Sequence, residues 1–285
     1  MSKWDNQYLD LCEKIIKEGK LHHNRTGDDT LRIIGHSFEF DLQEEFPVLS
    51  VKQVGIKGPI IELLWIYQAH SNKVQWLRDR GVTIWDEWEI DEDGVYRQDG
   101  SNRYFGKEYA GTIGEVYGWT TGDRRWPEKN IEMIKKSPSS RRNVIDLWQE
   151  AHFDKAVLPP CVYGCQFIVD DDLLHIRVTQ RSCDVGLGLP YNVTQYAAFV
   201  SMIAHVTGLK PGKMLYQITD THIYCKHIPA IKTMIERRDQ AKPAPKLWLN
   251  PEVTDFFEFD NSRELKDIKL IGYEHLGKVP MEVSI

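Results

Sequence analysis

The chain has 285 residues, of which 41% are hydrophobic and 27% are charged, and this composition is ordinary for a soluble globular protein. The length suffices for one large domain with a substantial core. The net charge of −6 argues against nucleic-acid binding as the main task, because neutralising a phosphate backbone needs a basic surface. A local basic pocket for one phosphate remains compatible with that charge.

Neither membrane insertion nor export is indicated. No stretch reaches the roughly 20 apolar residues of a transmembrane helix, and the N-terminal MSKWDNQYLD lacks the apolar core of a signal peptide. We therefore expect a cytoplasmic protein. The five cysteines include no CxxC pair, so reduced thiols are expected rather than a disulfide framework. His222, Cys225 and His227 have a spacing compatible with metal ligands, but no second ligand cluster accompanies them and we expect no metal.

The N-terminal part predicts a helix, a polar loop and extended structure. Apolar residues recur at helical spacing over residues 3–20. The polar HHNRTGDDT that follows predicts a loop containing Arg25, and an isolated loop arginine is by default a solvated residue. LRIIGHSFEFDL then alternates as strands around Gly35.

Residues 60–67, IIELLWIY, are apolar on every side except for Glu62. A helix that is apolar all round is buried, so desolvation should raise the pKa of the Glu62 carboxyl. Such a carboxyl is either half of a buried ion pair or a general acid or base, and the residues alone leave both possibilities open.

The following region carries aromatic residues. GVTIWDEW places Trp85 and Trp88 at i and i+3 of a short helical turn, where they form either plain core or a flat wall for a stacked heterocycle. Residues 90–112 are polar and Gly-rich, which indicates a mostly exposed insertion, and GEVYG then carries Tyr117. SPSSRRNVIDLW predicts a turn and a strand, with Arg141 and Arg142 just before the apolar alternation.

Adjacent residues on a strand face opposite sides, so Arg141 and Arg142 would rarely bind one ligand within one subunit. A charged sheet edge explains such a pair as well as a ligand does.

The stretch around which the chain is organised runs from Leu158 to Asn192, opening with LPPCVYGCQF and closing with QRSCDVGLGLPYN. Cys161 follows two prolines, whose fixed φ and missing donors give the thiol a rigid approach. FIVDDDLLHIRV predicts a two-strand hairpin. This hairpin would bring the thiol back toward Arg181, and a nearby guanidinium favours the thiolate.

An isolated cysteine is more often an inert buried residue than a nucleophile. The neighbours of Cys161 favour the nucleophile, because Arg181, Ser182, Asp184 and Asn192 add anion-binding, hydroxyl, carboxylate and amide groups within one short segment.

The C-terminal part predicts one long helix and several strands. NVTQYAAFVSMIAHVTGL is helical and ends at Gly208. KMLYQITDTHIY is a strand on which His222 and Tyr224 share one face, and KLWLNPEV and IKLIGYEH supply two more strands. No repeat, low-complexity tract or clear linker interrupts the chain, so we expect one domain over residues 1–285.

The motifs PPC, QRSCDVGLGLPYN and DTHIY together resemble thymidylate synthase, and the resemblance runs from NRTGDDT to the final EVSI. It implies an α+β single domain with a large mixed sheet flanked by helices. It also implies a methyltransferase of nucleotide biosynthesis that converts dUMP to dTMP, with 5,10-methylenetetrahydrofolate as donor of one carbon and a hydride. The partners implied are dUMP, the reduced folate and a second copy of the chain in a homodimer with shared active sites.

The resemblance also implies roles for matching residues. Cys161 would add to C6 of uracil and so turn C5 into an enolate-like carbon. Catalytic roles are implied for Cys161, Glu62, Tyr117, Arg181, Asp184 and Asn192. Nucleotide contacts are implied for Arg25, Gln180, Arg181, Ser182, Asp184, Asn192, His222 and Tyr224, with Arg141 and Arg142 supplied by the other subunit. Folate contacts are implied for Lys52, Trp85, Trp88, Asp184, Leu187, Gly188, Tyr191 and Ser284.

Two positions depart from the family pattern. Val162 stands where the family commonly has His after the nucleophile, which removes a donor near O4 of the base. Tyr191 stands where the family has Phe before the key asparagine. Asn192 itself can accept from N3–H and donate to O4, so it matches uracil, whereas a carboxylate would suit cytosine, as in the related cytidylate hydroxymethylases.

Two alternatives are set against the leading interpretation. A uridylate hydroxymethylase of the same fold would add water at the exocyclic methylene, but an indole such as Trp85 over that carbon excludes water. A catalytically silent nucleotide- or RNA-binding relative is disfavoured by the acidic charge and the intact set of Cys161, Arg181 and Asn192.

Overall fold

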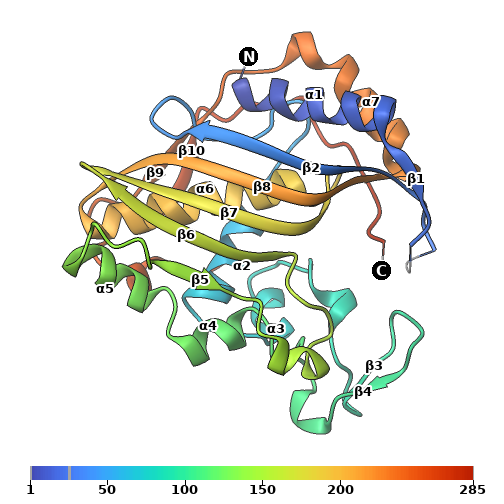
Figure 1. Ribbon diagram of the computed structural model, residues 1–285, viewed down its shortest axis with the longest axis horizontal. Helices are drawn as coiled ribbons and strands as arrows, with labels where there is room; N and C mark the ends of the chain where they lie inside the picture. Colours follow the sequence, from blue (N-terminus) through green and yellow to red (C-terminus); the bar gives the residue numbers. More distant parts are fainter. Residues whose placement is uncertain (1, 25–26, 285) are drawn as a thin grey trace.

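A six-stranded mixed sheet organises the computed structural model, which describes residues 2–24 and 27–284 (Figure 1). Its strand order is β1-β2-β8-β7-β6-β5. The strands are β1 (Lys20–His22), β2 (Thr30–Asp41), β5 (Val144–Asp146), β6 (Val162–Asp170), β7 (Leu173–Asp184) and β8 (Lys210–Tyr224). Only the β7–β8 pair is parallel among these described strands, and helix α6 (Leu189–Thr207) makes the crossover that a parallel pair requires.

The predicted hairpin and the long helix are both confirmed. β6 and β7 pair antiparallel from Asp170↔Leu173 back to Val162↔Gln180. Helix α6 ends at Gly208, which caps it in the left-handed conformation at φ 73°, where a residue without Cβ is favoured. Gly35 likewise has φ 76°, but β2 runs continuously past it, so the alternating segment around Gly35 is one strand.

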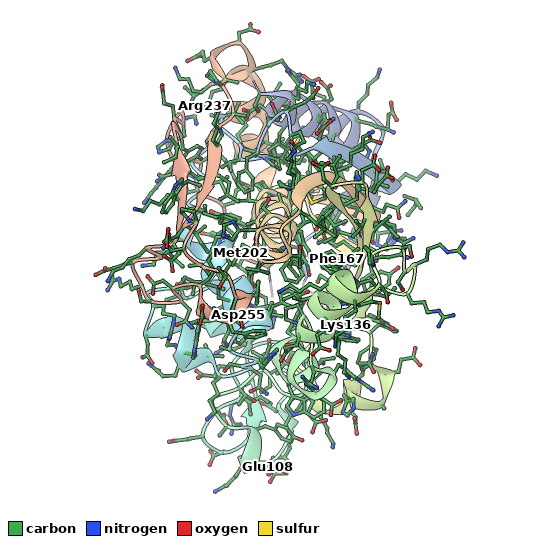
Figure 2. All side chains as sticks on the ribbon, turned by 90° about the vertical axis from the view of Figure 1, so that its left-hand side faces the viewer. Glu108, Lys136, Phe167, Met202, Arg237 and Asp255 are labelled. Carbon is green, nitrogen blue, oxygen red and sulfur yellow. The ribbon has the colours of Figure 1, made fainter. Side chains whose placement is uncertain are left out.

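Helices cover one face of the sheet. Helix α1 (Lys3–Glu18) packs on β2 and β8, α6 packs on β7 and β8, and α2 (Lys57–Tyr67) packs on α6 (Figure 1). Because sheet and α2 enclose α6 on two sides, fifteen of its residues are buried. Figure 2 shows this interior from the side, with Met202 and Phe167 inside and Glu108 and Arg237 at opposite ends. The helices predicted over 3–20 and 60–67 are therefore confirmed.

The opposite face of the sheet carries exposed side chains in register. Val144, Gln166, Arg177 and Leu215 form one row across β5, β6, β7 and β8. Val144 is 42% exposed and Leu215 is 41% exposed, and Ile168 on the same face is 38% exposed. Exposed apolar side chains that cluster on one face are typical of a surface that another molecule covers.

Shorter elements complete the chain. The two C-terminal strands are confirmed, but they form a separate two-stranded sheet. These elements are α3 (Val74–Arg78), η1 (Asp86–Trp88), β3 (Val95–Tyr96), β4 (Arg103–Tyr104), η2 (Lys107–Tyr109), α4 (Gly118–Arg124), α5 (Glu128–Lys136), η3 (Glu150–Lys155), η4 (Cys225–His227), α7 (Ile228–Glu236), η5 (Arg238–Gln240), β9 (Lys246–Leu249), η6 (Phe256–Glu258) and β10 (Ile268–Ile271). None of the described helices is both long and apolar enough to span a membrane.

Candidate active site

Cys161 lies immediately before β6 and is partly exposed. The backbone amide of Arg181 donates to the carbonyl oxygen of Cys161 at 2.9 Å, next to the Val162↔Gln180 pair. The hairpin therefore brings the cysteine to Arg181, as the sequence predicts. None of the five cysteines, all of which the structure describes, forms a disulfide.

The guanidinium of Arg181 binds the segment that leads to the thiol. Its Nε donates to the carbonyl oxygen of Pro160 at 2.9 Å, and its Nη2 donates to that of Pro159 at 2.8 Å. The ring of Trp148 lies 5.7 Å from the guanidinium carbon. Because both prolines have a fixed φ, two charge-assisted hydrogen bonds suffice to fix the direction from which the chain enters Cys161.

Tyr117 approaches Cys161 from another element. Its hydroxyl oxygen accepts a hydrogen bond from the backbone amide of Cys161 at 3.0 Å. Burial raises the pKa of the Tyr117 hydroxyl well above its ordinary value, so it keeps its proton and can donate it to a further acceptor. The backbone of Tyr117 lies at φ 51° and ψ −106°, a strained combination of the kind that concentrates at functional sites.

The turn after Tyr117 depends on close packing. A side chain at Gly118 would place its Cβ 1.9 Å from the carbonyl oxygen of Ser71, so the start of α4 can approach Ser71 only without a side chain.

Glu62 lies on α2 with both carboxylate oxygens occupied by neutral donors. Trp85 Nε1 donates to Oε1 at 2.6 Å, and Gln195 Nε2 donates to Oε2 at 2.7 Å. Burial raises the pKa of the carboxyl, and the two hydrogen bonds partly oppose this rise. The raised pKa is as predicted. Among the described residues the partners of this carboxylate are Trp85 and Gln195, and no cation pairs with it.

The two tryptophans stand beside Glu62. The ring centroids of Trp85 and Trp88 are 5.4 Å apart, and that of Trp85 is 5.3 Å from the Tyr117 ring. Their turn, η1, is fastened by Arg78, whose guanidinium binds Asp86 at 2.9 Å and Glu89 at 2.9 and 2.6 Å. Sequence reasoning missed Arg78, because nothing in a short amphipathic helix identifies the acids that its last turn will meet.

Asn192 is oriented by a chain of hydrogen bonds from the sheet. Tyr216 on β8 donates to Gln180 Oε1 at 2.6 Å. Gln180 Nε2 then donates to the Ser182 carbonyl oxygen at 2.9 Å and, at 3.4 Å, to Asn192 Oδ1. Gln180 is nearly completely buried, so its amide has one satisfied orientation and Asn192 has a fixed neighbour. Tyr216 is a second residue that the sequence analysis did not single out.

Asp184 shapes the loop that begins α6. Its Oδ1 accepts from the backbone amides of Gly186 at 2.9 Å and Leu187 at 3.1 Å, and its carbonyl oxygen accepts from the amide of Gly188 at 3.0 Å. Its Oδ2 lies 3.9 Å from Nδ1 of His227. The Asp184 carboxylate thus fixes the loop through Oδ1, while its Oδ2 faces His227.

Lys52 lies beneath this loop. It is 3% exposed, and its ammonium donates to the carbonyl oxygen of Gly186 at 2.9 Å. Burial lowers the pKa of Lys52 to about 8, although the Asp184 carboxylate opposes the change. The ring of Tyr191 lies 5.6 Å from the ammonium. Lys52 therefore contacts both the Gly186 carbonyl and the Tyr191 ring.

His222 and Tyr224 lie side by side on β8, as predicted. Their ring centroids are 5.3 Å apart, and His222 Nδ1 lies 2.8 Å from Asp220 Oδ1. Arg32 on β2 binds the other oxygen of Asp220 at 3.1 Å. The Asp220 carboxylate, itself bound by Arg32, therefore fixes the orientation of the His222 imidazole through Nδ1.

The C-terminal segment is bound to two distant elements. Ser284 Oγ donates to Asp28 Oδ2 at 2.7 Å, and Lys226 donates to the same oxygen at 2.7 Å and to the carbonyl oxygen of Val283 at 3.3 Å. His227 Nε2 lies 2.8 Å from the carbonyl oxygen of Glu282. Because His227 also lies next to Asp184, this contact places the C-terminal segment near the Asp184 loop.

Two predicted site residues make none of the contacts described above. Arg141 and Arg142 are exposed, and they precede β5. The prediction for Arg25 concerns a position outside the described residues. Within the described parts of the chain no group of three or more His, Cys, Asp or Glu side chains is placed to hold a metal.

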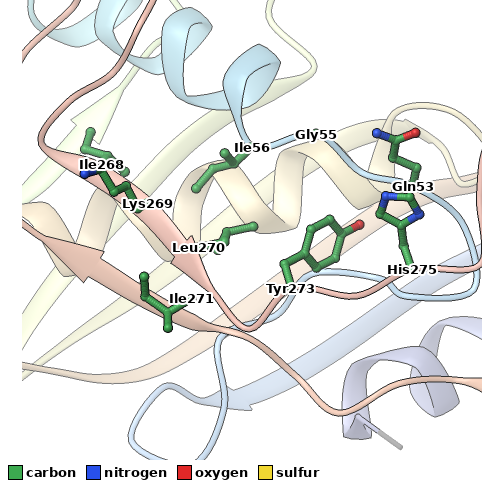
Figure 3. A pocket seen from close by; sticks show the side chains of 9 residues that line it. All are labelled: Gln53, Gly55, Ile56, Ile268, Lys269, Leu270, Ile271, Tyr273 and His275. Carbon is green, nitrogen blue, oxygen red and sulfur yellow. The ribbon is translucent and has the colours of Figure 1, made fainter.

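The structure also has a surface groove of about 500 Å³ (Figure 3). It lies between β10 and the segment before α2. Its walls are Gln53, Gly55, Ile56, Ile268, Lys269, Leu270, Ile271, Tyr273 and His275. None of these is a predicted site residue, so the groove does not mark the site around Cys161.

Comparisons with known proteins agree with the geometry. A family model described as thymidylate synthase matches residues 6–285. The chain is 38% identical to a thymidylate synthase of Clostridium beijerinckii over 285 residues, which is 100% of each chain. It superposes on the solved structure of the thermostable thymidylate synthase A from Bacillus subtilis with a TM-score of 0.84 and 36% identity, over 99% of each chain. The α+β architecture is that of this neighbour, and the chain belongs to the thymidylate synthase family.

Proposed function

We propose that the protein converts dUMP to dTMP, with 5,10-methylenetetrahydrofolate as the source of the added carbon and of the hydride. The observation that carries this proposal is the placement of Cys161 between Arg181 and Tyr117, with Asn192 reached from the same strand through Gln180. The relatives named thymidylate synthase support the same reaction.

Cys161 is the nucleophile in this proposal. Its sulfur forms a bond to C6 of the uracil, and the π electrons of the C5–C6 bond move toward O4, which leaves C5 able to attack an electrophilic carbon. Tyr117 keeps its proton because burial raises its pKa, so it can donate a hydrogen bond near the reacting base. Arg181 favours the thiolate, since a cation near a thiol lowers the free energy of the charged form.

Nucleotide recognition is divided between base, ribose and phosphate. Asn192 reads the N3–H and O4 edge of uracil through its amide. His222 and Tyr224 bind the ribose. The phosphate is bound by Arg181 and Ser182, together with Arg25, while Gln180 and Asp184 support this set and Arg141 and Arg142 are contributed by a partner subunit.

The loop around Asp184 and the tryptophan turn fit a reduced pterin. Asp184 Oδ2 is directed away from the loop amides that occupy Oδ1, so it can accept from an N–H group. Trp85 and Trp88 offer ring faces for stacking. Further contacts are proposed for Lys52, Leu187, Gly188, Tyr191 and Ser284. When bound, the folate supplies first a methylene group and then a hydride.

Glu62 manages proton transfers in this scheme. Its pKa is raised by burial, which brings it closer to neutral pH and suits a group that both accepts and releases a proton. Trp85 donates to the same carboxylate, so the indole that limits access of water is fixed to the proton-transfer residue.

A homodimer with shared active sites is proposed as the functional unit. The row of Val144, Gln166, Arg177 and Leu215 gives the uncovered sheet face a partly apolar surface that a second copy can bury. Arg141 and Arg142 precede β5 at the edge of this sheet, where they could reach the partner's phosphate site. A cytoplasmic location is part of the same proposal.

The test is an assay with dUMP and methylenetetrahydrofolate, followed by the absorbance of dihydrofolate. Methylation oxidises the folate, so dihydrofolate should form in step with dTMP. Accumulation of a nucleotide product while the folate stays at the tetrahydro level would identify a hydroxymethylase instead, and no reaction at all would favour a silent binder. No observation on the described residues favours either alternative.

A further inference from the structure

Residues 90–112 are exposed at their tip but anchored at their base. Ile90 and Tyr96 are 0% and 2% exposed, and together with Val157 they form a small buried cluster, here called the hairpin core. Trp88 and Leu158 pack against the hairpin core, and both also pack against the main hydrophobic core of the protein. The hairpin core therefore joins the tryptophan turn, through Trp88, to the segment that leads to Cys161, through Val157 and Leu158.

Arg103 binds the β3–β4 hairpin to the segment before the nucleophile. On β4, its Nη2 donates to the carbonyl oxygen of Val157 at 2.7 Å. Its guanidinium carbon lies 5.3 Å from each of the Tyr96 and Phe105 rings. Nη2 also lies 3.5 Å from Oδ2 of Asp99, so this planar cation has a carbonyl oxygen, a carboxylate and two rings as neighbours.

Two arginines thus bind the approach to Cys161 from different elements. Arg103 binds the carbonyl of Val157, and Arg181 on β7 binds those of Pro159 and Pro160. Pro159 and Pro160 lack a backbone donor, so this part of the segment depends on contacts to its carbonyls, whereas the amide of Val157 also donates to the carbonyl oxygen of Ile113 at 3.2 Å.

We propose that Arg103 is a positioning residue that sets the separation between Trp88 and Cys161. The inference rests on the proposed function, in which Trp88 belongs to the folate wall and Cys161 binds the nucleotide. Loss of the Arg103 contact removes one of the ties between the two sides, so their separation is held less firmly. Since reactivity depends steeply on the distance between reacting groups, transfer from folate to nucleotide suffers more than binding of either molecule.

The consequence for chemistry is a change of product ratio. Once C5 has accepted the methylene and lost its proton, the exocyclic carbon can receive either hydride, giving dTMP and dihydrofolate, or the oxygen of water, giving 5-hydroxymethyl-dUMP and tetrahydrofolate. Both routes release the C5 hydrogen, but only the first oxidises folate. Displacement of Trp88 from the nucleotide admits water. A variant without the Arg103 contact should therefore form a larger share of 5-hydroxymethyl-dUMP.

The experiment compares Arg103→Ala with Arg103→Lys and with a matched control, Arg97→Ala. Arg97 belongs to the same exposed segment but pairs with Asp91 at 2.6 Å, within that segment. Tritium release from 5-tritiated dUMP and dihydrofolate formation are measured in parallel. We expect equal rates for the unaltered protein and for Arg97→Ala. For Arg103→Ala we expect dihydrofolate formation to fall roughly tenfold, with tritium release exceeding it and dUMP affinity within about twofold of normal.

A second readout needs no folate. Hydrogen exchange at the amides of Leu158 and Cys161 should accelerate in Arg103→Ala, and alkylation of Cys161 by iodoacetamide should change in rate. Cys225, which is also partly exposed, should be alkylated at an unchanged rate and serves as an internal control. Arg103→Lys keeps the charge but loses the planar group, so it should lie between the other two variants.

The outcomes separate the two proposals. If the unaltered protein makes no dihydrofolate, the proposed function fails, and the exchange and alkylation data alone decide the role of Arg103. If the unaltered protein is active and Arg103→Ala keeps equal tritium and dihydrofolate rates, the inference is overturned. A loss of thermal stability with both rates lowered equally also overturns it. Should Arg103→Ala fail to fold, the same comparison is made with Arg103→Lys.

Discussion

The backbone amide of Cys161 donates to the hydroxyl oxygen of Tyr117 at 3.0 Å, and Tyr117 is itself held at φ 51°. A strained residue therefore supplies the acceptor for the amide of the nucleophile. Strain of this kind persists only where surrounding contacts over-determine it, and here the tight packing of Gly118 on Ser71 provides such contacts.

Tyr117→Phe should lower kcat by about 10- to 100-fold, because it removes both the acceptor for the Cys161 amide and a donor near the base. The orphaned amide should also lower the free energy of unfolding by about 1–3 kcal/mol. Steady-state kinetics and denaturant titration measure the two effects. Tyr109→Phe is the control, since the Tyr109 hydroxyl donates to Glu115 away from Cys161. Equal effects of the two changes would contradict the role of Tyr117.

Cys161→Ser should abolish turnover and leave dUMP binding within about twofold of normal, because the thiolate acts in the covalent step whereas the arginines bind the phosphate. Calorimetric titration with dUMP and the dihydrofolate assay measure binding and turnover separately. Cys225→Ser should retain activity. Near-normal turnover in Cys161→Ser would rule out the assignment of the nucleophile.

Part of this site is encoded locally and is readable from the sequence. The Cys161–Arg181 neighbourhood follows from a hairpin whose acidic turn and alternating strands bring its two ends together, although an irregularity between Val162 and Gly164, which no pattern in the sequence indicates, shifts the last pair to Val162↔Gln180. The raised pKa of Glu62 follows equally from an apolar helix with one carboxyl on it. The roles of individual residues came from the family resemblance and stay predictions.

Other parts depend on long-range pairing that no local pattern announces. Tyr216 meets Gln180 because β8 pairs parallel with β7, and Arg103 meets Val157, 54 residues away, because the hairpin core packs the β3–β4 hairpin against the segment before Cys161. The expectation that 90–112 is mostly exposed holds at the tip but overlooked the buried Ile90 and Tyr96. These side chains lie among polar and Gly-rich neighbours, so composition over the segment conceals them.

Glu62→Gln should make stability less dependent on pH. The raised pKa means that the folded state holds the Glu62 proton more tightly than the unfolded chain does. Stability from this group is therefore complete below the ordinary glutamate pKa and is lost as pH rises through the raised value. The variant should gain stability relative to the unaltered protein across that window, as measured by denaturant titrations at a series of pH values. The same series on the exposed Glu252→Gln should show no such gain, and a relative gain on acidification in Glu62→Gln would contradict the burial argument.

Asn192→Asp should shift preference from dUMP toward dCMP, because a protonated or partnered carboxyl matches the cytosine edge, whereas the amide matches uracil. Competition between the two nucleotides in one assay gives the ratio of their kcat/KM values. Because the base contacts decide between the two nucleotides, we expect this ratio to change by about tenfold or more. An unchanged ratio would mean that another residue reads the base.

Hybrid dimers test the shared site. Inactive Cys161→Ser and inactive Arg141→Ala subunits, mixed and allowed to exchange, should regain up to about a quarter of the normal activity, since one of the two sites in each hybrid would have an intact cysteine and an intact partner arginine. Mixing two batches of Cys161→Ser controls for reactivation by handling. Absence of recovery after exchange has been verified by mass spectrometry would contradict a site built from two subunits.

The central claim is that carbon and hydride both pass from the folate to C5 of the nucleotide, and a deuterium label tests it most directly. Methylenetetrahydrofolate deuterated at C6 is incubated with dUMP and the protein, and the mass of the nucleotide product is measured by mass spectrometry. We predict dTMP with one deuterium in its methyl group, formed in equal amount with dihydrofolate. A 5-hydroxymethyl product without deuterium, with the label retained in tetrahydrofolate, would contradict the account.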